Sequence, residues 1–458
     1  MGSLVGLAQA RSESYHFDMG IDRRVFDMLL DWVGSFGAVV EAMAIGESNL
    51  LFISDDFGAL ELLWRGLRSR ARQMPVAGAF VDFGRAALSP TLLSGGIAHA
   101  VDEAFGGEQT REGEPPGWLT SPAAVRAKRA DMALRAELSE VLDRFVSKSS
   151  DERRRPVLLM KDVCCLRALR NYKGVGDPFR GLGEALGNFP TIQLVVLQYG
   201  LSPAAVFETA HACLSRESTS AKVMPRLSAD EASAIASHIL ADEPSDEASG
   251  ALCSLCDGRL SYLMAFCGLL AARRVPLHEE QLVDAMVEAL LDPVSALSAI
   301  LRSRMRDAIS SVRGDTVLRH ILRVMSFATL RRLRSTSDSG MSASEVALRI
   351  GRSVPAASDY LRWLMRSLLL EKRGSRYVFG DRLLRLWVRL DTLGAGGTSG
   401  VKREFLRQMV REELLEHRRE DEPPAVEAAS GEPGPSKAEA EERLEVVKRR
   451  DEQFLEFD

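Results

Sequence analysis

Two adjacent carboxylates, Asp55 and Asp56, follow a short apolar segment at the place where a phosphate-binding loop would carry its chemistry. Such a loop has the pattern G-x-x-x-x-G-K-S/T between a buried strand and a helix, so that backbone amides and a lysine surround the phosphates. Residues 49–58, NLLFISDDFG, contain neither the lysine nor the paired glycines of that pattern. Because two carboxylates repel a triphosphate, the segment predicts that no phosphate is held there.

Four short apolar segments, each bounded by turn-forming or charged residues, are expected to form strands: residues 50–53, 78–82, 157–160 and 193–198. Helical patterns lie between them, and one at residues 59–68 follows the two carboxylates directly. This alternation predicts an α/β domain with a mostly parallel sheet. From about residue 226 helical patterns dominate, and a Ser342-x-x-Glu345 capping box then begins a helix, a turn, a second helix and a β-ribbon.

Composition limits the class of protein. Apolar residues make up 46% and charged residues 27% of the chain, and no run of 18 apolar residues is present, so no membrane span is expected. Residues 1–20 lack the apolar stretch of a secretory signal. Six cysteines in 458 residues do not suggest a disulfide framework, and Cys253-x-x-Cys256 is interpreted as part of a buried helix. We expect a cytoplasmic protein without a bound metal.

The order of these elements resembles the AAA+-related P-loop ATPases of the STAND and archaeal-ATPase type, over roughly residues 22–395. Residues 155–166, RPVLLMKDVCCL, are similar to the Walker B strand of that family, and residues 191–200, TIQLVVLQYG, to its sensor strand. The resemblance implies an α/β fold with a P-loop NTPase-like parallel-sheet domain, then an all-helical lid and a winged-helix domain. The expected limits are an N-terminal extension at 1–21, the α/β domain at 22–225, the lid at 226–314, the winged helix at 315–395, a C-terminal helix at 396–418 and a disordered acidic tail at 419–458.

The chain departs from the family pattern at each catalytic position. Lys161 stands where an aspartate would hold magnesium, Asp162 falls at the position of the general-base glutamate, and Gln198 lies at the polar end of the sensor strand. A lysine at this position repels magnesium instead of binding it. This degenerate nucleotide site is therefore expected to bind neither magnesium nor ATP, and no cofactor is expected. Two arrangements of these side chains are open: an ion pair of Lys161 with Asp55 or Asp56 that fills the empty phosphate site, or solvation of all three side chains.

The region predicted to form the winged helix is strongly basic. Residues 301–390 contain 19 Lys and Arg against 7 Asp and Glu, a net charge of +12. In winged helices the second helix and the wing contact DNA, and arginine binds phosphates and guanine. The alternative is that this domain packs on the nucleotide domain and regulates it. The candidate DNA-binding residues are Arg352, Arg362, Arg366, Lys372, Arg373 and Arg376.

The C-terminal tail combines a flexible, acidic composition with an apolar tip. Residues 418–458 contain 7 Lys and Arg against 13 Asp and Glu, and the chain ends in EQFLEFD. A short acidic-hydrophobic motif of this kind docks in basic or apolar grooves. We expect Phe454, Leu455 and Phe457 to bind a partner protein such as an active AAA+-like ATPase; a frayed terminus or docking on the basic winged helix are the alternatives.

These patterns lead to one expected function and two alternatives. The expected function is a catalytically inactive pseudo-ATPase that acts as a scaffold or regulator through DNA or protein contacts. The first alternative is an ATPase with an atypical site, which would bind ATP and magnesium. The second is a winged-helix transcription regulator.

Overall fold

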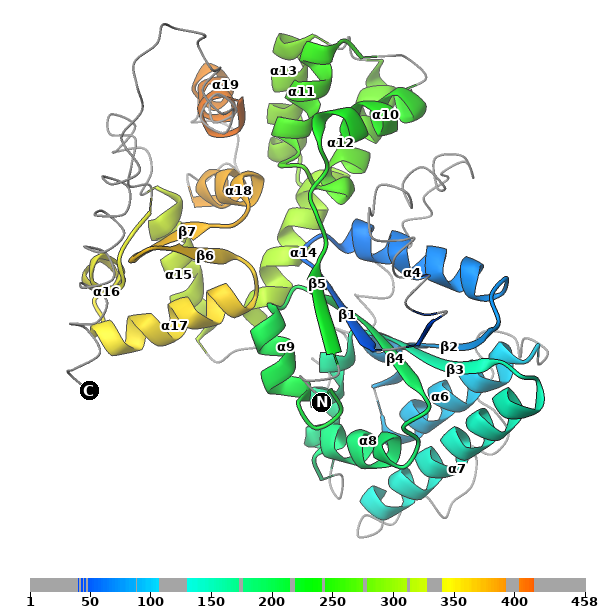
Figure 1. Ribbon diagram of the computed structural model, residues 1–458. Helices are drawn as coiled ribbons and strands as arrows, with labels where there is room; N and C mark the ends of the chain where they lie inside the picture. The colour runs from blue at the N-terminus through cyan, green and yellow to red at the C-terminus, as the bar shows by residue number, and fades with distance from the viewer. Residues whose placement is uncertain are drawn as a thin grey trace, which may run out of the picture. The chain divides into compact units, whose positions relative to one another are not determined.

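The computed structural model describes residues 40, 43, 45, 46 and 48–415, except 88, 107–129, 173–175, 215–218, 241–243, 275–277, 311–313, 328–339 and 393–402. The tail predicted at residues 419–458 lies outside the described residues. Figure 1 shows the arrangement of the elements.

Five parallel strands form one sheet in the order β2-β3-β4-β1-β5 (Figure 1). The strands are β1 (Asn49–Ser54), β2 (Val76–Asp82), β3 (Arg155–Lys161), β4 (Gln193–Tyr199) and β5 (Thr219–Val223). The four predicted strands are confirmed as β1 to β4. The fifth was not predicted, because its sequence TSAKV has no apolar run and its residues are exposed or half-buried at the edge of the sheet.

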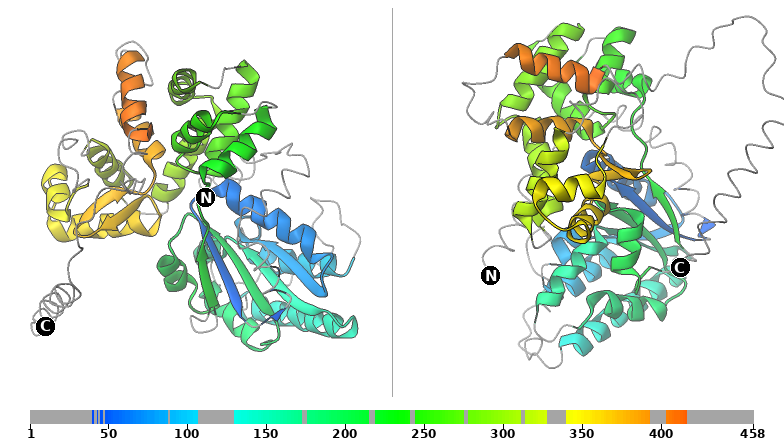
Figure 2. Two further views of the ribbon diagram at one scale, coloured as in Figure 1. Left: turned by 45° about the horizontal axis from the view of Figure 1, so that its top comes forward. Right: turned by 90° about the vertical axis from the view of Figure 1, so that its left-hand side faces the viewer.

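Helices cover both faces of the sheet, which explains why β1 to β4 are apolar along nearly their whole length. Leu50 and Phe52 of β1 belong to the same core as α4 (Phe57–Ala71), whereas Leu51 and Ile53 belong to a second core. The second core includes side chains of α6 (Pro90–Ala104), α7 (Ala130–Asp151) and α8 (Pro178–Gly187). Figures 1 and 2 show α4 on one face and α6, α7 and α8 on the other.

After β5 the described chain is helical as far as β6. The helices are α10 (Ala229–Leu240), α11 (Asp246–Leu255), α12 (Leu260–Arg273), α13 (Glu279–Leu291) and α14 (Ala296–Ser310). The core that contains α4 continues into these helices without a break. In the described residues no single helix is long and apolar enough to cross a membrane, although the bent pair α11 and α12 passes the same length and composition test.

The C-terminal region contains the elements predicted for helix, turn, helix and ribbon. They are α15 (Asp315–Ser326), α16 (Ala343–Ile350), α17 (Val354–Arg366), β6 (Leu370–Arg373) and β7 (Arg376–Phe379), followed by α18 (Arg382–Thr392), α19 (Arg403–Val410) and a π-helical turn (Arg411–Leu415). The predicted capping box is confirmed, because Ser342 Oγ accepts from Glu345 N at 3.2 Å and Glu345 Oε2 accepts from Ser342 N at 2.8 Å. The strands β6 and β7 pair in antiparallel register.

Candidate functional site at the carboxyl end of the sheet

The turn between β1 and α4 is too short to surround a phosphate. The strand β1 ends at Ser54 and the helix begins at Phe57, so only two residues lie between them. Asp56 is the N-cap, and its carboxylate accepts from the amides of Gly58 at 3.0 Å and Ala59 at 3.5 Å. Free amides of this kind hold the phosphate at a helix N-terminus in a P-loop. Here the amides already have a carboxylate partner.

A second helix meets Asp56 from the helical region. The amide of Ser261, in the first turn of α12, donates to the Asp56 carboxylate at 3.3 Å. The approach of the two helices is close, because a Cβ at Gly58 would lie 3.2 Å from Ser261 Cα. Asp56 is therefore buried between the N-terminal ends of α4 and α12, with 7% of its surface exposed.

Asp55 is held by two buried arginines. Its carboxylate lies 2.5 Å from Arg259 Nη1 and 2.9 Å from Arg304 Nη2. Burial opposes ionisation of Asp55, but the charges of Arg259 and Arg304 outweigh it and lower the pKa of this carboxyl. Asp55 is thus a fixed negative charge at neutral pH.

The same arginines reach a third carboxylate, Asp381, in the turn between β7 and α18. Arg304 Nη1 lies 2.5 Å from Asp381 Oδ2, and Arg259 Nε lies 3.3 Å from it. The hydroxyl of Tyr262 donates to Asp381 at 2.6 Å, and the amide of Leu384 donates at 2.8 Å. Asp381 has no exposed surface; burial alone would raise its pKa, but the two arginines outweigh that effect and lower it.

Asp257 joins Asp55 and Asp381, so that three carboxylates balance three guanidinium groups. Asp257 lies 3.1 Å from Arg226 and 3.5 Å from Arg259, and burial raises the pKa of this carboxyl. We call the whole group the carboxylate–arginine cluster. Its members are Asp55, Asp257, Asp381, Arg226, Arg259, Arg304 and Tyr262. Buried charges are tolerated only when paired, and the three carboxylates here face three guanidinium groups.

The predicted ion pair of Lys161 with Asp55 or Asp56 is wrong, and so is the solvated alternative. The Lys161 ammonium is buried and lies 2.7 Å from Glu61 Oε2 and 3.5 Å from Asp82 Oδ2. Lys161 is paired with Asp82 in the register of β3 and β2, and α4 brings Glu61 over the same end of the sheet. Burial lowers the pKa of Lys161, but the carboxylates outweigh it and raise the pKa overall, so the lysine stays charged.

Asp162 and Gln198 connect the ends of neighbouring strands. The Asp162 carboxylate accepts from the amide of Tyr199 at 3.0 Å and from Gln198 Nε2 at 3.2 Å. Gln198 Oε1 accepts from the amide of Cys164, in the 3-10 helix that follows β3. Asp162 has φ +56°, a left-handed conformation at the point where the chain turns out of the sheet. These contacts give both residues a structural role between β3 and β4.

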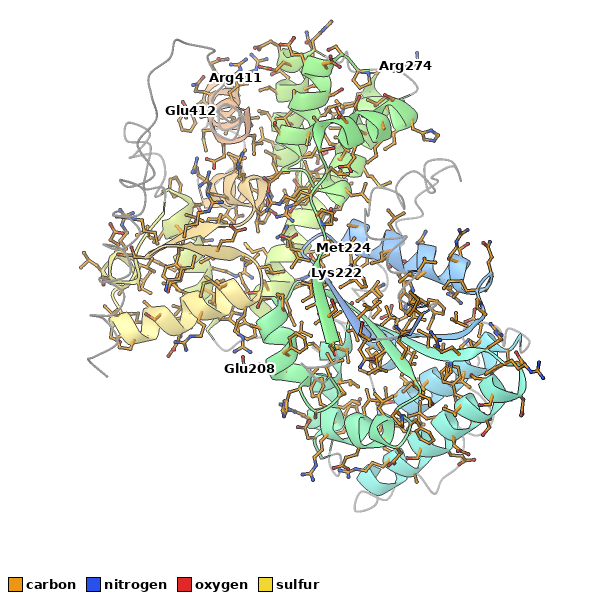
Figure 3. All side chains as sticks on the ribbon, viewed as in Figure 1. Glu208, Lys222, Met224, Arg274, Arg411 and Glu412 are labelled. Carbon is orange, nitrogen blue, oxygen red and sulfur yellow. The ribbon has the colours of Figure 1, made fainter. Side chains whose placement is uncertain are left out.

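Two of the six predicted DNA-binding residues form ion pairs with acids on other elements. Arg366, at the C-terminal end of α17, lies 2.9 Å from Glu208 of α9 (Pro203–Ala210), which Figure 3 labels. The amide of Ser202 also donates to the carbonyl of Arg366 at 2.8 Å. Arg376 lies 3.2 Å from Glu345 and is mostly buried. Arg366 therefore fits the alternative in which this domain packs on the nucleotide domain.

The other four predicted DNA-binding residues lie on the surface. Arg362 and Arg373 pair only with exposed acids of their own element, Asp359 at 3.1 Å and Glu371 at 3.6 Å. Arg352 and Lys372 are exposed, and no ion pair is recorded for either within the described part of the chain. Figure 1 shows α16, the start of α17 and the β6–β7 turn at one end of the C-terminal region.

Three further predictions concern the C-terminal tip, the cysteines and a bound metal. Phe454, Leu455 and Phe457 lie outside the described residues, so their partner contact stays a prediction. The six cysteines are free thiols. Within the described ranges, no group of three His, Cys, Asp or Glu side chains could hold a metal ion.

The arginines that hold Asp55 were not predicted from the sequence. Arg259 and Asp381 are charged residues inside largely apolar stretches, and a charge in such a stretch needs a buried partner. That signal was available for these two residues but not for Arg304, which lies among other charged residues in the sequence LRSRMRD. The identity of the partner was not available, because Arg304 is 249 residues from Asp55 in the chain.

No protein-family model and no curated protein matches this sequence. Among solved structures, a Walker-type ATPase of Pyrococcus abyssi is similar over 77% of this chain and 94% of its own, with a TM-score of 0.51 and 11% identity. The ORC2 protein of Aeropyrum pernix in its ADP form covers 86% of this chain and 94% of its own, with 11% identity and a TM-score of 0.38. A RuvB point mutant of Thermotoga maritima covers 79% and 93%, with 12% identity and a TM-score of 0.35.

The first of these likenesses defines the fold and nothing further. At 11% identity it supports a common architecture, whereas the two lower TM-scores carry no structural argument. A five-stranded parallel sheet between helices, followed by a helical region, is the P-loop NTPase-like fold of AAA+ proteins. The fold predicted from the element order is thereby confirmed.

Proposed function

We propose that this chain is a catalytically inactive, AAA+/STAND-like pseudo-ATPase that acts as a scaffold or regulator through contacts with DNA and with partner proteins. The observation that carries the proposal is the position of Asp56. Its carboxylate takes the amides at the N-terminus of α4 that a nucleotide phosphate would need. The proposed domains are those expected from the sequence, with limits at residues 225, 314 and 395.

A second observation supports the absence of catalysis. At the end of β3, Lys161 stands where the family pattern has the aspartate that would hold magnesium. Its ammonium is the partner of Glu61 and Asp82, so neither of these carboxylates is free to take a metal ion. Phosphoryl transfer depends on positioned phosphates and a metal ion, and this site offers a partner to neither.

Nucleotide binding is the direct test. We expect a fluorescent ATP analogue with magnesium to show no saturable change in anisotropy up to about 1 mM protein. A dissociation constant of about 1 mM corresponds to a binding free energy of only about −4 kcal/mol. The physical reason is that Asp55 and Asp56 already occupy the arginines and helix amides that a triphosphate would need, and that the phosphate-binding loop is missing. A Walker-type ATPase measured in parallel shows that the assay responds. Saturable binding at micromolar concentration would favour the alternative of an ATPase with an atypical site.

We place the proposed DNA contact at the end of the C-terminal region formed by α16, the start of α17 and the β6–β7 turn. Arg352 and Lys372 are exposed there, and Arg362 and Arg373 have only exposed partners. An exposed ion pair contributes little free energy, so these arginines can exchange their acids for phosphates at small cost. Arg366 and Arg376 are left out of the proposed contact, because their acids lie on other elements.

Removing two of these charges should weaken DNA binding in a salt-dependent way. We expect Arg352→Ala with Lys372→Ala to lower the affinity about tenfold and to reduce the slope of log K against log salt by about 2, since each phosphate contact contributes about 0.9. The measurement is a salt titration with duplex DNA and the full chain. The control is Arg144→Ala with Lys148→Ala, which removes two exposed charges from α7. Equal slopes in the two double variants would remove this surface from the proposal.

A further inference from the structure

The carboxylate–arginine cluster joins three parts of the chain that are far apart in sequence. Asp55 belongs to the β1–α4 turn of the sheet domain. Arg259 precedes α12 and Arg304 lies on α14, so both come from the helical region. Asp381 lies between β7 and α18, beyond the ribbon. A single Arg304 side chain contacts both Asp55 and Asp381.

The centre of the cluster is buried, and solvent reaches the cluster at Asp55 and at Arg226. Side-chain exposure is 1% for Arg259, 6% for Arg304, 0% for Asp381 and 4% for Asp257, whereas it is 26% for Asp55 and 42% for Arg226. Arg259 Nη2 donates to the carbonyl of Gly380 at 3.3 Å, but its Nε and Nη1 meet the carboxylates as ion-pair contacts without hydrogen-bond alignment. Among the three carboxylates of the cluster, Asp55 is therefore the one that a solute could replace.

Carboxylates and phosphates are recognised by the same protein groups. Arginine binds both through its planar fork of N–H donors, and helix N-termini bind both through free amides. Asp55 meets the arginines, and Asp56 meets the amides of α4 and α12. Between them, the two aspartates use both kinds of phosphate-binding group.

We propose that Asp55 and Asp56 are built-in substitutes for nucleotide phosphates, and that they hold the helical region and the β7–α18 turn on the sheet domain without any ligand. This inference rests on the proposed function in one respect, which is that no nucleotide occupies the site. In such an arrangement the helical region and the β7–α18 turn stay on the sheet domain permanently. The surfaces of the C-terminal region are then presented continuously instead of in a nucleotide-dependent cycle.

The proposal predicts which ligand would fit if Asp55 were removed. Asp55→Ala leaves two buried guanidinium groups short of one negative charge, at a position that solvent already reaches. The ligand class that restores the balance is a small tetrahedral oxyanion, and inorganic phosphate is the probe. In the wild-type protein the Asp55 carboxylate fills this position, so phosphate is expected to have no effect on its stability through this site.

The experiment compares thermal unfolding of the full-length protein in sodium phosphate and in sodium chloride at equal ionic strength and pH 7. In chloride we expect Asp55→Ala to unfold several degrees below wild type. In phosphate we expect its midpoint to rise in a saturable way, as binding to the folded state requires. The matched control is Asp102→Ala, which removes a carboxylate that also faces two cations, Arg144 at 3.6 Å and Lys148 at 3.9 Å, but at the surface. The control should not respond to phosphate.

Small-angle X-ray scattering gives the second readout, because it reports the arrangement of the domains. We expect Asp55→Ala to have a larger radius of gyration than wild type in chloride and to return to the wild-type value in phosphate. Unchanged scattering in chloride, or a midpoint that phosphate moves no more than it moves the Asp102→Ala control, would overturn the proposal. Nucleotide is absent from these samples, so the result is separate from the ATP-binding test, whose failure would overturn the proposed function instead.

Asp55→Asn provides the test if Asp55→Ala does not fold. The charged groups that act on Asp55 are Arg226, Arg259 and Arg304. Asp257, Asp381 and Tyr262 contact the same arginines from their other sides. Because the folded state lowers the pKa of Asp55, its contribution is complete above the unfolded pKa and is lost as pH falls. The stability gap between wild type and Asp55→Asn should be constant from about pH 5 to pH 8 and should narrow below about pH 4. A gap that is absent at pH 7 would overturn the proposal.

Discussion

Replacing Asp381 with alanine is expected to lower the free energy of unfolding by about 3–5 kcal/mol, the range for removing one partner of a buried ion pair. Asp381 is fully buried and is shared by Arg259, Arg304 and Tyr262. After the substitution the two guanidinium groups keep only the partly exposed Asp55 as a common partner. The hydroxyl of Tyr262 also loses its acceptor. Urea unfolding at pH 7 measures the effect.

A carboxylate on α18, the helix that follows Asp381, separates this effect from a general loss of charge. Asp391, near the end of α18, lies 3.8 Å from Arg323, and both side chains are about half exposed. Asp391→Ala should cost less than about 1 kcal/mol, as exposed pairs do. Asp381→Asn, which retains an acceptor for the Leu384 amide, should fall between the two. If Asp381→Ala costs no more than Asp391→Ala, the cluster does not hold these elements together.

The sequence predicted the sheet well where burial alone decides the pattern. The strands β1, β3 and β4 are buried on both faces, so each appears as a continuous apolar run. The strand β5 has no such run, because it pairs only with β1 and leaves its other edge unpaired within the described sheet. Its formation depends on the backbone of β1, which no local pattern reveals.

The place of Asp55 and Asp56 at the end of a strand was predicted from the sequence, but their contacts were not. Asp55 and Asp56 are recognisable because they interrupt an apolar run at the end of a strand. The predicted partner of Lys161 was wrong because the acid nearest to it depends on the order of strands, which is a property of the whole sheet. With β3 next to β2, Asp82 is the acid at the same level as Lys161, and the β1–α4 turn lies on the far side of β4.

Replacing Lys161 with methionine is expected to lower the free energy of unfolding by about 2–3 kcal/mol. The cost is below that of a fully buried pair, because Glu61 and Asp82 keep 19% and 27% of their side chains exposed. The lysine also lies 5.2 Å from the centre of the Phe57 ring, which methionine can still contact. Without the cation, the pKa of Glu61 should rise, because the coulombic and hydrogen-bonding contributions of Lys161 that lower it are lost.

A double-mutant cycle assigns that loss to the ion pair instead of to packing. Glu61→Gln in the Lys161→Met background should cost about 1–2 kcal/mol less than in wild type, because the carboxylate it removes has lost its buried cation. Arg65→Met is the control, since Arg65 also lies 3.1 Å from Glu61 but is 41% exposed. We expect it to cost less than about 1 kcal/mol. Equal costs of Glu61→Gln in both backgrounds would mean that Lys161 fills space at the end of β3 without an energetic role as a cation.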